Sequence, residues 1–107
     1  MKKMKKKGAK LARSSSLASL AEIMEILLSP GGCPWDRRQT HSTLVKYLKE
    51  EAGEAASAVR KKDWANLREE LGDVLLQVVF HSALARREGH FTLSDVIRTV
   101  NSKMVRR

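Results

Sequence analysis

One long hydrophobic pattern constrains the fold of this chain more than any other feature. Between Asp63 and Gly89, aliphatic residues follow a period of about 3.6 residues: Leu67, Leu71, Val74, Leu75, Val78 and Leu84. This period predicts a single helix, with Asp63 as its N-terminal cap and Gly89 as its end. At about 1.5 Å per residue the helix is roughly 37 Å long, well above the globular average. We therefore expect a bundle in which other helices cover its apolar side.

Three further helices are predicted from the same period and from capping residues. Each begins behind a residue that can cap a helix N-terminus: Ser16, Thr40 and Thr92. The first lasts about three turns, the second covers residues 41–61, and the last opens with a capping box in which Asp95 is the second member. Residues 33–40 have no period and are expected to form an ordered loop. The predicted fold class is all-α, with four helices forming an oligomeric helical bundle.

The length of the chain, 107 residues, limits it to one domain. A core of this size buries only about 60 to 65 % of the unfolded surface, so we expect a partner subunit. Residues are 42 % hydrophobic but 5 % aromatic, which favours Leu-, Val- and Ala-rich helices over a sheet. No run reaches the roughly 18 apolar residues of a membrane span, and the single cysteine, Cys33, suits a reducing compartment. A cytoplasmic protein without membrane contact is expected.

The formal charge of +9 is concentrated at one end of the chain. The first 20 residues hold seven Lys and Arg side chains and no acidic one, so +2 remains for the rest. A lysine- and serine-rich leader of this kind is typically solvated and disordered. We predict a basic disordered tail at residues 1–16 and a folded domain at residues 17–107. Loose attraction of the tail to nucleic acid or to a membrane surface is the alternative, but the folded part is only mildly basic.

Two short acidic motifs lie within the predicted helices. Glu51 and Glu54 are three residues apart in the second helix, and Glu70 and Asp73 are three apart in the third. Residues at this spacing share one helix face, and here that face interrupts or borders the apolar side. A turn near residues 61–63 places the two pairs at comparable heights, so four carboxylates can converge. Burying ionised carboxylates without a partner is strongly unfavourable, so something must neutralise them.

A divalent cation is the simplest neutralising partner. An all-oxygen ligand set suits Mg²⁺ or Mn²⁺, whereas di-iron sites in bundles use a Glu-x-x-His pair that this chain lacks. The alternative, a solvated acidic face paired with lysines, fits the neighbouring Glu50 and Glu69 well. Gly53 and Gly72 each precede an acid of the set, and we expect them to permit a close approach of helices.

Four segments resemble, in order and in spacing, those of the MazG family of nucleotide pyrophosphohydrolases: GGCPWDRRQTHSTL, YLKEEAGE, REELGDVLLQVVFH and EGHFTLSDVIRTVNSKMVRR. The family signature is EExxE, a spacer and ExxD, and the resemblance covers residues 19–107. It implies an all-α fold, assembled as a homodimer or a dimer of dimers. It also implies a magnesium site formed by the four acids of the two motifs: Glu51, Glu54, Glu70 and Asp73. Glu50 is a further catalytic candidate, for orienting water or a second ion.

The resemblance also suggests residues that contact substrate. Asn101, Lys103 and Arg107 match the family's N-x-K-x-x-R-R segment and would face the charge of a triphosphate. Surface solvation is the competing interpretation for these three side chains. Trp35, in the CPWD loop, either covers a nucleobase or fills the core, and the sequence leaves both open. The three histidines have no metal-ligand spacing and are expected to be structural.

The function that the resemblance implies is Mg²⁺-dependent hydrolysis of nucleoside and deoxynucleoside triphosphates to the monophosphate and pyrophosphate, as house-cleaning of the nucleotide pool. A narrow-specificity relative, acting on dCTP, dUTP or phosphoribosyl-ATP, stays open because base selectivity depends on the shape of the pocket. A non-catalytic helical module with a nucleic-acid-binding tail is the alternative from another class. That alternative leaves the inward-facing acids unexplained.

Overall fold

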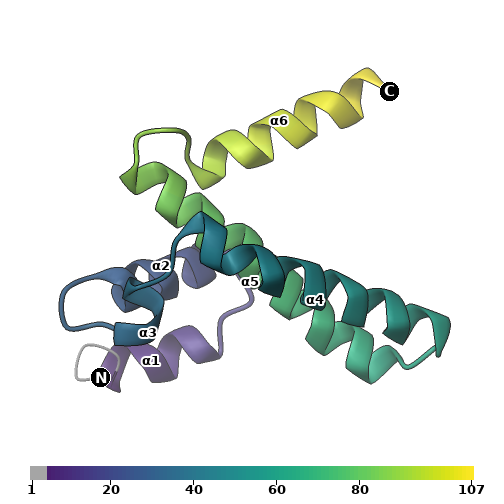
Figure 1. The fold of residues 1–107 in the computed structure, drawn as a ribbon, viewed down its shortest axis with the longest axis horizontal. Coiled ribbons are helices and arrows are strands. Elements are labelled where there is room, and N and C mark those ends of the chain that lie inside the picture. Colours follow the sequence, from purple (N-terminus) through teal and green to yellow (C-terminus); the bar gives the residue numbers. More distant parts are fainter. Residues whose placement is uncertain (1–4) are drawn as a thin grey trace.

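The computed structural model describes residues 5–107 of the chain. This part is all-helical, as the sequence predicts (Figure 1). Its helices are α1 (Lys5–Ala12), α2 (Leu17–Leu28), α3 (Pro34–Arg37), α4 (His41–Arg60), α5 (Trp64–Arg87) and α6 (Leu93–Arg106). Within residues 5–107, no helix combines the length and the apolar character that a membrane crossing requires.

An antiparallel pair of helices, α4 and α5, forms the centre of the structure (Figure 1). The chain reverses direction between them at residues 61–63, where Lys62 has a φ of 55°. The side chain of Asp63 accepts a hydrogen bond of 3.2 Å from the backbone N–H of Asn66 and so caps α5, as predicted. At the other end of the pair, Thr40 caps α4 and forms a capping box with Thr43. Both long helices therefore have defined starting points.

The remaining predicted caps are also present. Ser16 accepts a hydrogen bond from the backbone N–H of Ser19 at the start of α2. Thr92 and Asp95 form the capping box that opens α6. Gly89, with a φ of 79°, follows the end of α5, where a left-handed residue commonly ends a helix.

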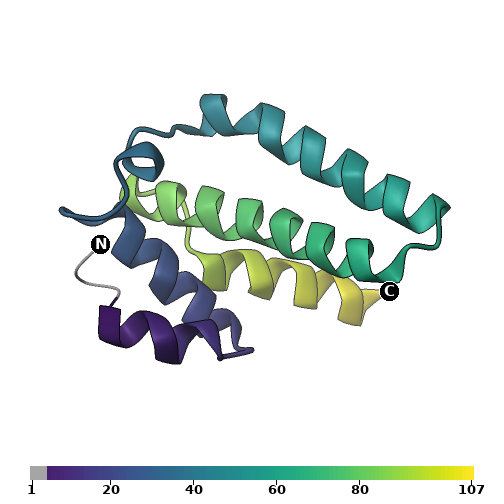
Figure 2. The same cartoon turned by 90° about the horizontal axis from the view of Figure 1, so that it is seen from below.

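The hydrophobic core lies at one end of the α4–α5 pair. Its buried side chains come from α2, the start of α4 and the second half of α5: Met24, Leu28, Leu44, Val79, Phe80 and Ala83. Leu44 is fully buried, but Leu48, one turn later on α4, is 38 % exposed and Leu71 on α5 is 52 % exposed. The other end of the pair thus carries apolar side chains that residues 5–107 of this chain leave uncovered. In Figure 2, α2 lies against the end of α5 that holds the core.

The N-terminal segment differs from the predicted disordered tail, because residues Lys5–Ala12 form helix α1. Helix α1 contacts α2, and its Leu11 is buried. Lysine is a good helix former. Burial of Leu11 against a neighbouring helix is a tertiary contact, which the composition of the segment does not reveal. Residues 1–4 of the predicted tail lie outside the described residues. The expected loop at 33–40 also contains a short helix, α3, which has Pro34 in its first turn.

The glycines of the acidic motifs do not have the role we expected. A Cβ atom built at Gly53 or Gly72 would meet nothing within 4 Å, so neither glycine permits a close helix approach within this chain. Gly32 is the residue at a tight contact. It is buried just after α2, and a Cβ atom there would collide with the carbonyl oxygens of Leu27 and Ile26. The chain passes so close to the end of α2 that position 32 has room for a hydrogen atom but not for a Cβ atom.

We predict opposite effects of alanine at two glycines. Gly32→Ala should lower the melting temperature, because its methyl group displaces backbone at the end of α2. Gly53→Ala should stabilise the fold by about 1 kcal/mol, since alanine favours a helix interior and space is open. Thermal unfolding of both variants at one protein concentration checks the pair. Equal melting temperatures for the two variants would contradict it.

Candidate metal centre

Three carboxylates meet where α4 and α5 face each other. One oxygen atom from each of Glu51, Glu70 and Asp73 lies within 4.8 Å of the other two, and all three residues are half-buried. The register of the hairpin explains the meeting. Glu51 and Asp73 are each eleven residues from Lys62 in the turn, and Glu54 and Glu70 are each eight residues from it. Because both helices rise by the same amount per residue, these positions become level in an antiparallel pair.

The fourth predicted ligand, Glu54, lies at the edge of this group. Its side chain is exposed, and it forms a hydrogen bond with the carboxyl group of Glu70. Glu50 and Glu69, which directly precede Glu51 and Glu70, are both exposed, as expected for residues on a solvated face. Among residues 5–107, no second cluster of His, Cys, Asp or Glu has a comparable geometry. The hairpin therefore concentrates the predicted metal ligands at one place.

The proximity of these acids changes their titration. The hydrogen bond with Glu54 raises the pKa of Glu70 to about 7, and burial and the neighbouring carboxylates act in the same direction. Burial raises the pKa of Glu51 as well, and repulsion from Asp73 and Glu54 adds to this effect. Without a cation, the cluster reduces its repulsion by keeping a proton near neutral pH.

Two oxygen atoms in the cluster test whether a metal ion fits. Oε2 of Glu51 and Oε2 of Glu70 are buried and have no hydrogen-bond partner. Buried polar atoms in proteins are almost always satisfied, so this pair requires an explanation. A hard divalent cation takes carboxylate oxygens as ligands, and it would satisfy both atoms while removing the repulsion. The residues of this site therefore fit Mg²⁺ or Mn²⁺.

The predicted phosphate contacts are not brought to this cluster in the single chain. Asn101, Lys103 and Arg107 all lie at or just beyond the second half of α6 and are exposed. Helix α6 diverges from the α4–α5 hairpin (Figure 1). Among the described residues, no ion pair joins Lys103 or Arg107 to the four acids. Their role stays a prediction.

Trp35 is held on the surface near α4. Its side chain is 44 % exposed, and its ring meets the ring of Tyr47 edge-on, with centroids 5.8 Å apart and planes at 69°. Tyr47 itself packs against the hydrophobic core and lies one helical turn before Glu51. Our sequence analysis overlooked Tyr47, although its four-residue spacing from Glu51 was a usable signal. Trp35 thus leaves part of its ring open to a ligand.

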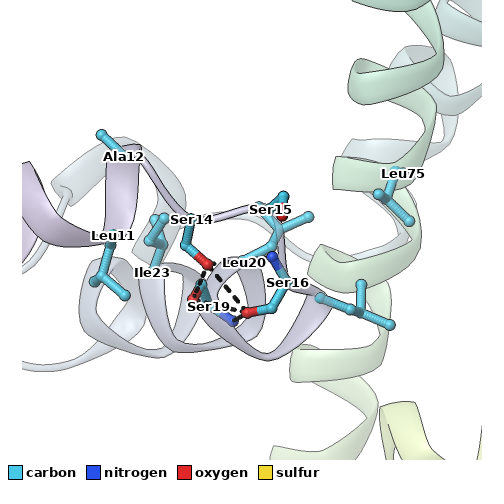
Figure 3. A pocket seen from close by; sticks show the side chains of 10 residues that line it. Leu11, Ala12, Ser14, Ser15, Ser16, Ser19, Leu20, Ile23 and Leu75 are labelled. Carbon is cyan, nitrogen blue, oxygen red and sulfur yellow. Dashed lines mark hydrogen bonds between the residues drawn. The ribbon is translucent and has the colours of Figure 1, made fainter.

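The pocket drawn in Figure 3 is a different site. It has a volume of about 560 Å³ and lies between the α1–α2 connection and Leu75 of α5. Serine hydroxyl groups and aliphatic side chains line it, and Ser14, Ser16 and Ser19 hydrogen-bond to one another there. None of its lining residues is charged. It therefore has no acidic side chain to bind a metal ion and no basic side chain to bind phosphate.

Comparison with known proteins connects this geometry to a family. Residues 39–107 match the MazG nucleotide pyrophosphohydrolase domain, and this range contains α4, α5, α6 and the whole acidic cluster. The chain belongs to the MazG family. The prediction from the EExxE and ExxD motifs is thereby confirmed at the level of the family.

This MazG-family chain is similar to several bacterial proteins. It is 57 % identical over 88 residues to the nucleoside triphosphate pyrophosphohydrolase/pyrophosphatase MazG of Thermotoga maritima, covering 82 % of this chain and 34 % of the relative. It is 43 % identical over 89 residues to the nucleoside triphosphate pyrophosphohydrolase of Escherichia coli K12, with coverages of 82 % and 34 %. For the protein of that name from Mycobacterium tuberculosis, the values are 42 % over 94 residues, 86 % and 28 %. The chain thus spans about a third of the length of these relatives.

The raised pKa of Glu70 predicts how the stability of the metal-free MazG-family chain depends on pH. The folded carboxyl has a pKa of about 7 against an ordinary value of 4.5, so the unfolded form releases its proton first. Stability should therefore fall as the pH rises from about 4.5 to 7. Glu70→Gln should weaken this fall in melting temperature, measured in EDTA. Glu69→Gln, at the exposed neighbouring acid, is the matched control, and identical profiles for the two variants would count against the assignment.

Proposed function

We propose that this chain hydrolyses nucleoside and deoxynucleoside triphosphates to the monophosphate and pyrophosphate in an Mg²⁺-dependent reaction, with Mn²⁺ able to substitute. The observation that carries the proposal is the cluster of Glu51, Glu70 and Asp73 with its two unpartnered oxygen atoms. Such a cluster repels a triphosphate unless a cation lies between them. The names of the similar proteins from Thermotoga maritima and Escherichia coli support the same reaction.

The residues of the hairpin would have different roles in the reaction. We assign the ion to the four acids of the two motifs: Glu51, Glu54, Glu70 and Asp73. When bound, Mg²⁺ would neutralise negative charge on the phosphate oxygens. The reaction adds water across the α,β-phosphoanhydride bond, so this P–O bond breaks and a proton of the water passes to a base. Glu50, which is exposed next to Glu51, is our candidate for orienting the water.

A second subunit would complete the site. The exposed apolar side chains of α5 and α6 include Leu71, Leu75, Val100 and Met104. Leu71 and Leu75 are four residues apart and share one face of α5, so a subunit contact over them would cover that face. A homodimer or a dimer of dimers would bury these side chains, and it would offer α6 a place to bring cations towards the triphosphate. We assign Asn101, Lys103 and Arg107 to that task.

The nucleobase would bind against Trp35. Its ring contacts the ring of Tyr47 edge-on, and 44 % of the Trp35 side chain is exposed. A base could therefore stack on it without displacing the core. Stacking on an indole ring tolerates different bases, which is consistent with a cytoplasmic house-cleaning enzyme that acts on several triphosphates. A narrow-specificity relative would have additional side chains that form hydrogen bonds with the edge of the base.

The first prediction concerns the reaction. Pyrophosphate release should be measured with the eight common NTPs and dNTPs, with and without Mg²⁺. Turnover should require the ion, and Glu70→Gln should reduce kcat/KM by at least about 100-fold, since it removes a charged ligand at the reacting phosphates. Glu69→Gln should retain the wild-type rate, because Glu69 is exposed and outside the cluster. Pyrophosphate release that ignores Mg²⁺ and both substitutions would refute the proposal, and turnover of one triphosphate alone would favour the narrow-specificity relative.

The second prediction concerns the phosphate contacts on α6. Lys103→Ala should raise KM about 10- to 100-fold, as expected when a charge-assisted hydrogen bond to phosphate is lost. Arg98→Ala is the matched control, because Arg98 lies about 140° around the helix from Lys103, pairs with Asp95 and should leave KM unchanged. Steady-state kinetics of the full chain measure both variants. Equal KM values for the two variants would place Lys103 in the solvated surface instead.

A further inference from the structure

Two histidines join α4 to α5 at the end of the hairpin that holds the core. His41 is the first residue of α4, and His81 lies in the second half of α5. Their Nδ1 atoms are 2.7 Å apart, their ring planes differ by 17°, and the ring centroids are 5.0 Å apart. At these values the line between the two Nδ1 atoms lies close to both ring planes. This geometry is that of a short N–H···N hydrogen bond between imidazoles.

The surrounding atoms determine where the protons are. Nε2 of His41 lies 3.1 Å from Oε2 of Glu88, and a carboxylate can only accept, so His41 donates from Nε2. Nε2 of His81 is buried and has no hydrogen-bond partner, so a proton placed there would be unsatisfied. The arrangement that leaves no donor unsatisfied has both rings neutral. In it, Nδ1–H of His81 donates to Nδ1 of His41, and Nε2–H of His41 donates to Glu88.

Further protons are incompatible with this chain of bonds. A third proton on the pair must occupy the buried Nε2 of His81, which has no acceptor. A fourth removes the accepting lone pair of His41 and places two cations in contact. The negative charge of Glu88 compensates added protons on the pair only in part, because Glu88 also lies 3.4 Å from Nε2 of His90. Burial and the nearness of His41 lower the pKa of His81, in agreement with the geometry.

Charged groups on the other packed elements are engaged elsewhere. On α2, Glu25 pairs with Arg86 and Arg87 at 3.5 and 3.2 Å. On α6, Asp95 pairs with Arg98 at 2.9 Å. The charged group bonded to the pair is Glu88, which also contacts His90, and both lie in the connection between α5 and α6.

We propose that the His41–His81 pair is an acid-sensitive link, which ties the start of α4 to α5 while both rings are neutral and opens when the pair takes up protons. Opening releases His41 from Glu88 as well, so the start of α4 and the α5–α6 connection loosen together. The link is a conformational device of the fold, and it does not rest on the proposed enzymatic reaction.

Long-range ¹H–¹⁵N NMR spectra of the full, metal-free chain test the link directly, since they report which ring nitrogens carry protons. Between pH 8 and 5, loss of the Nδ1–Nδ1 hydrogen bond should appear in the ring nitrogen signals of His41 and His81 together, with Nε2 of His81 unprotonated at pH 8. Backbone amide signals of residues 41–45 and 88–92 should shift on the same curve. Independent titration of His81 at an ordinary pKa, or amide signals that do not follow it, would overturn the proposal.

Thermal unfolding of variants gives a second readout. A histidine with a lowered pKa stays neutral in the folded chain while the unfolded form binds a proton, so stability falls as the pH drops below 6.5. Between pH 7 and 5, wild type should lose several degrees more in melting temperature than His81→Gln, and His41→Gln should lie between the two because His81 stays buried in it. His90→Gln is the matched control and should follow wild type. Glu70 acts equally in every variant, so its effect cancels. A wild-type pH profile in both His41 and His81 variants would refute the link, and if one variant does not fold, the other decides.

Discussion

The packing of α4 against α5 is the interaction on which both the fold and the candidate site depend. Their antiparallel register, set by the turn at Lys62, brings Glu51 level with Asp73. A slip of one residue would rotate each side chain by about 100° around its helix and separate the carboxylates. The caps Thr40 and Asp63 define where the two helices start. Their hydrogen bonds therefore have a functional consequence besides their contribution to helix stability.

Stability and charge are separated along this hairpin. Leu44 and Val79 are buried in the core at one end, whereas Glu51, Glu70 and Asp73 repel one another farther along. A like-charge cluster opposes folding, so it has to lie on a scaffold that other contacts stabilise. The core supplies those contacts, and none of its residues is acidic. This division explains how one small domain keeps several carboxylates close together and still presents them to a ligand.

How much the sequence predicts depends on whether a feature is local. The caps of the four longer helices were predicted correctly, because capping and helical period involve residues a few positions apart. The meeting of Glu51, Glu70 and Asp73 followed from one further assumption, a short turn between two helices. Helix α1, the open space at Gly53 and the divergence of α6 depend on how whole helices pack against one another. Spacing within one sequence does not encode these contacts, so those expectations failed or stay open.

Two groups with opposite linkage to pH act on the same pair of helices. Protonation weakens the His41–His81 link, whereas it relieves repulsion at Glu70. In the metal-free chain, a fall in pH thus loosens one end of the hairpin and relaxes the other. A bound cation would reduce the repulsion at Glu70 in place of the proton. The effect of pH on the acidic end would then no longer counteract its effect on the histidine end. The hairpin would then respond to acid through the histidine pair, and its charged end would respond to the ion.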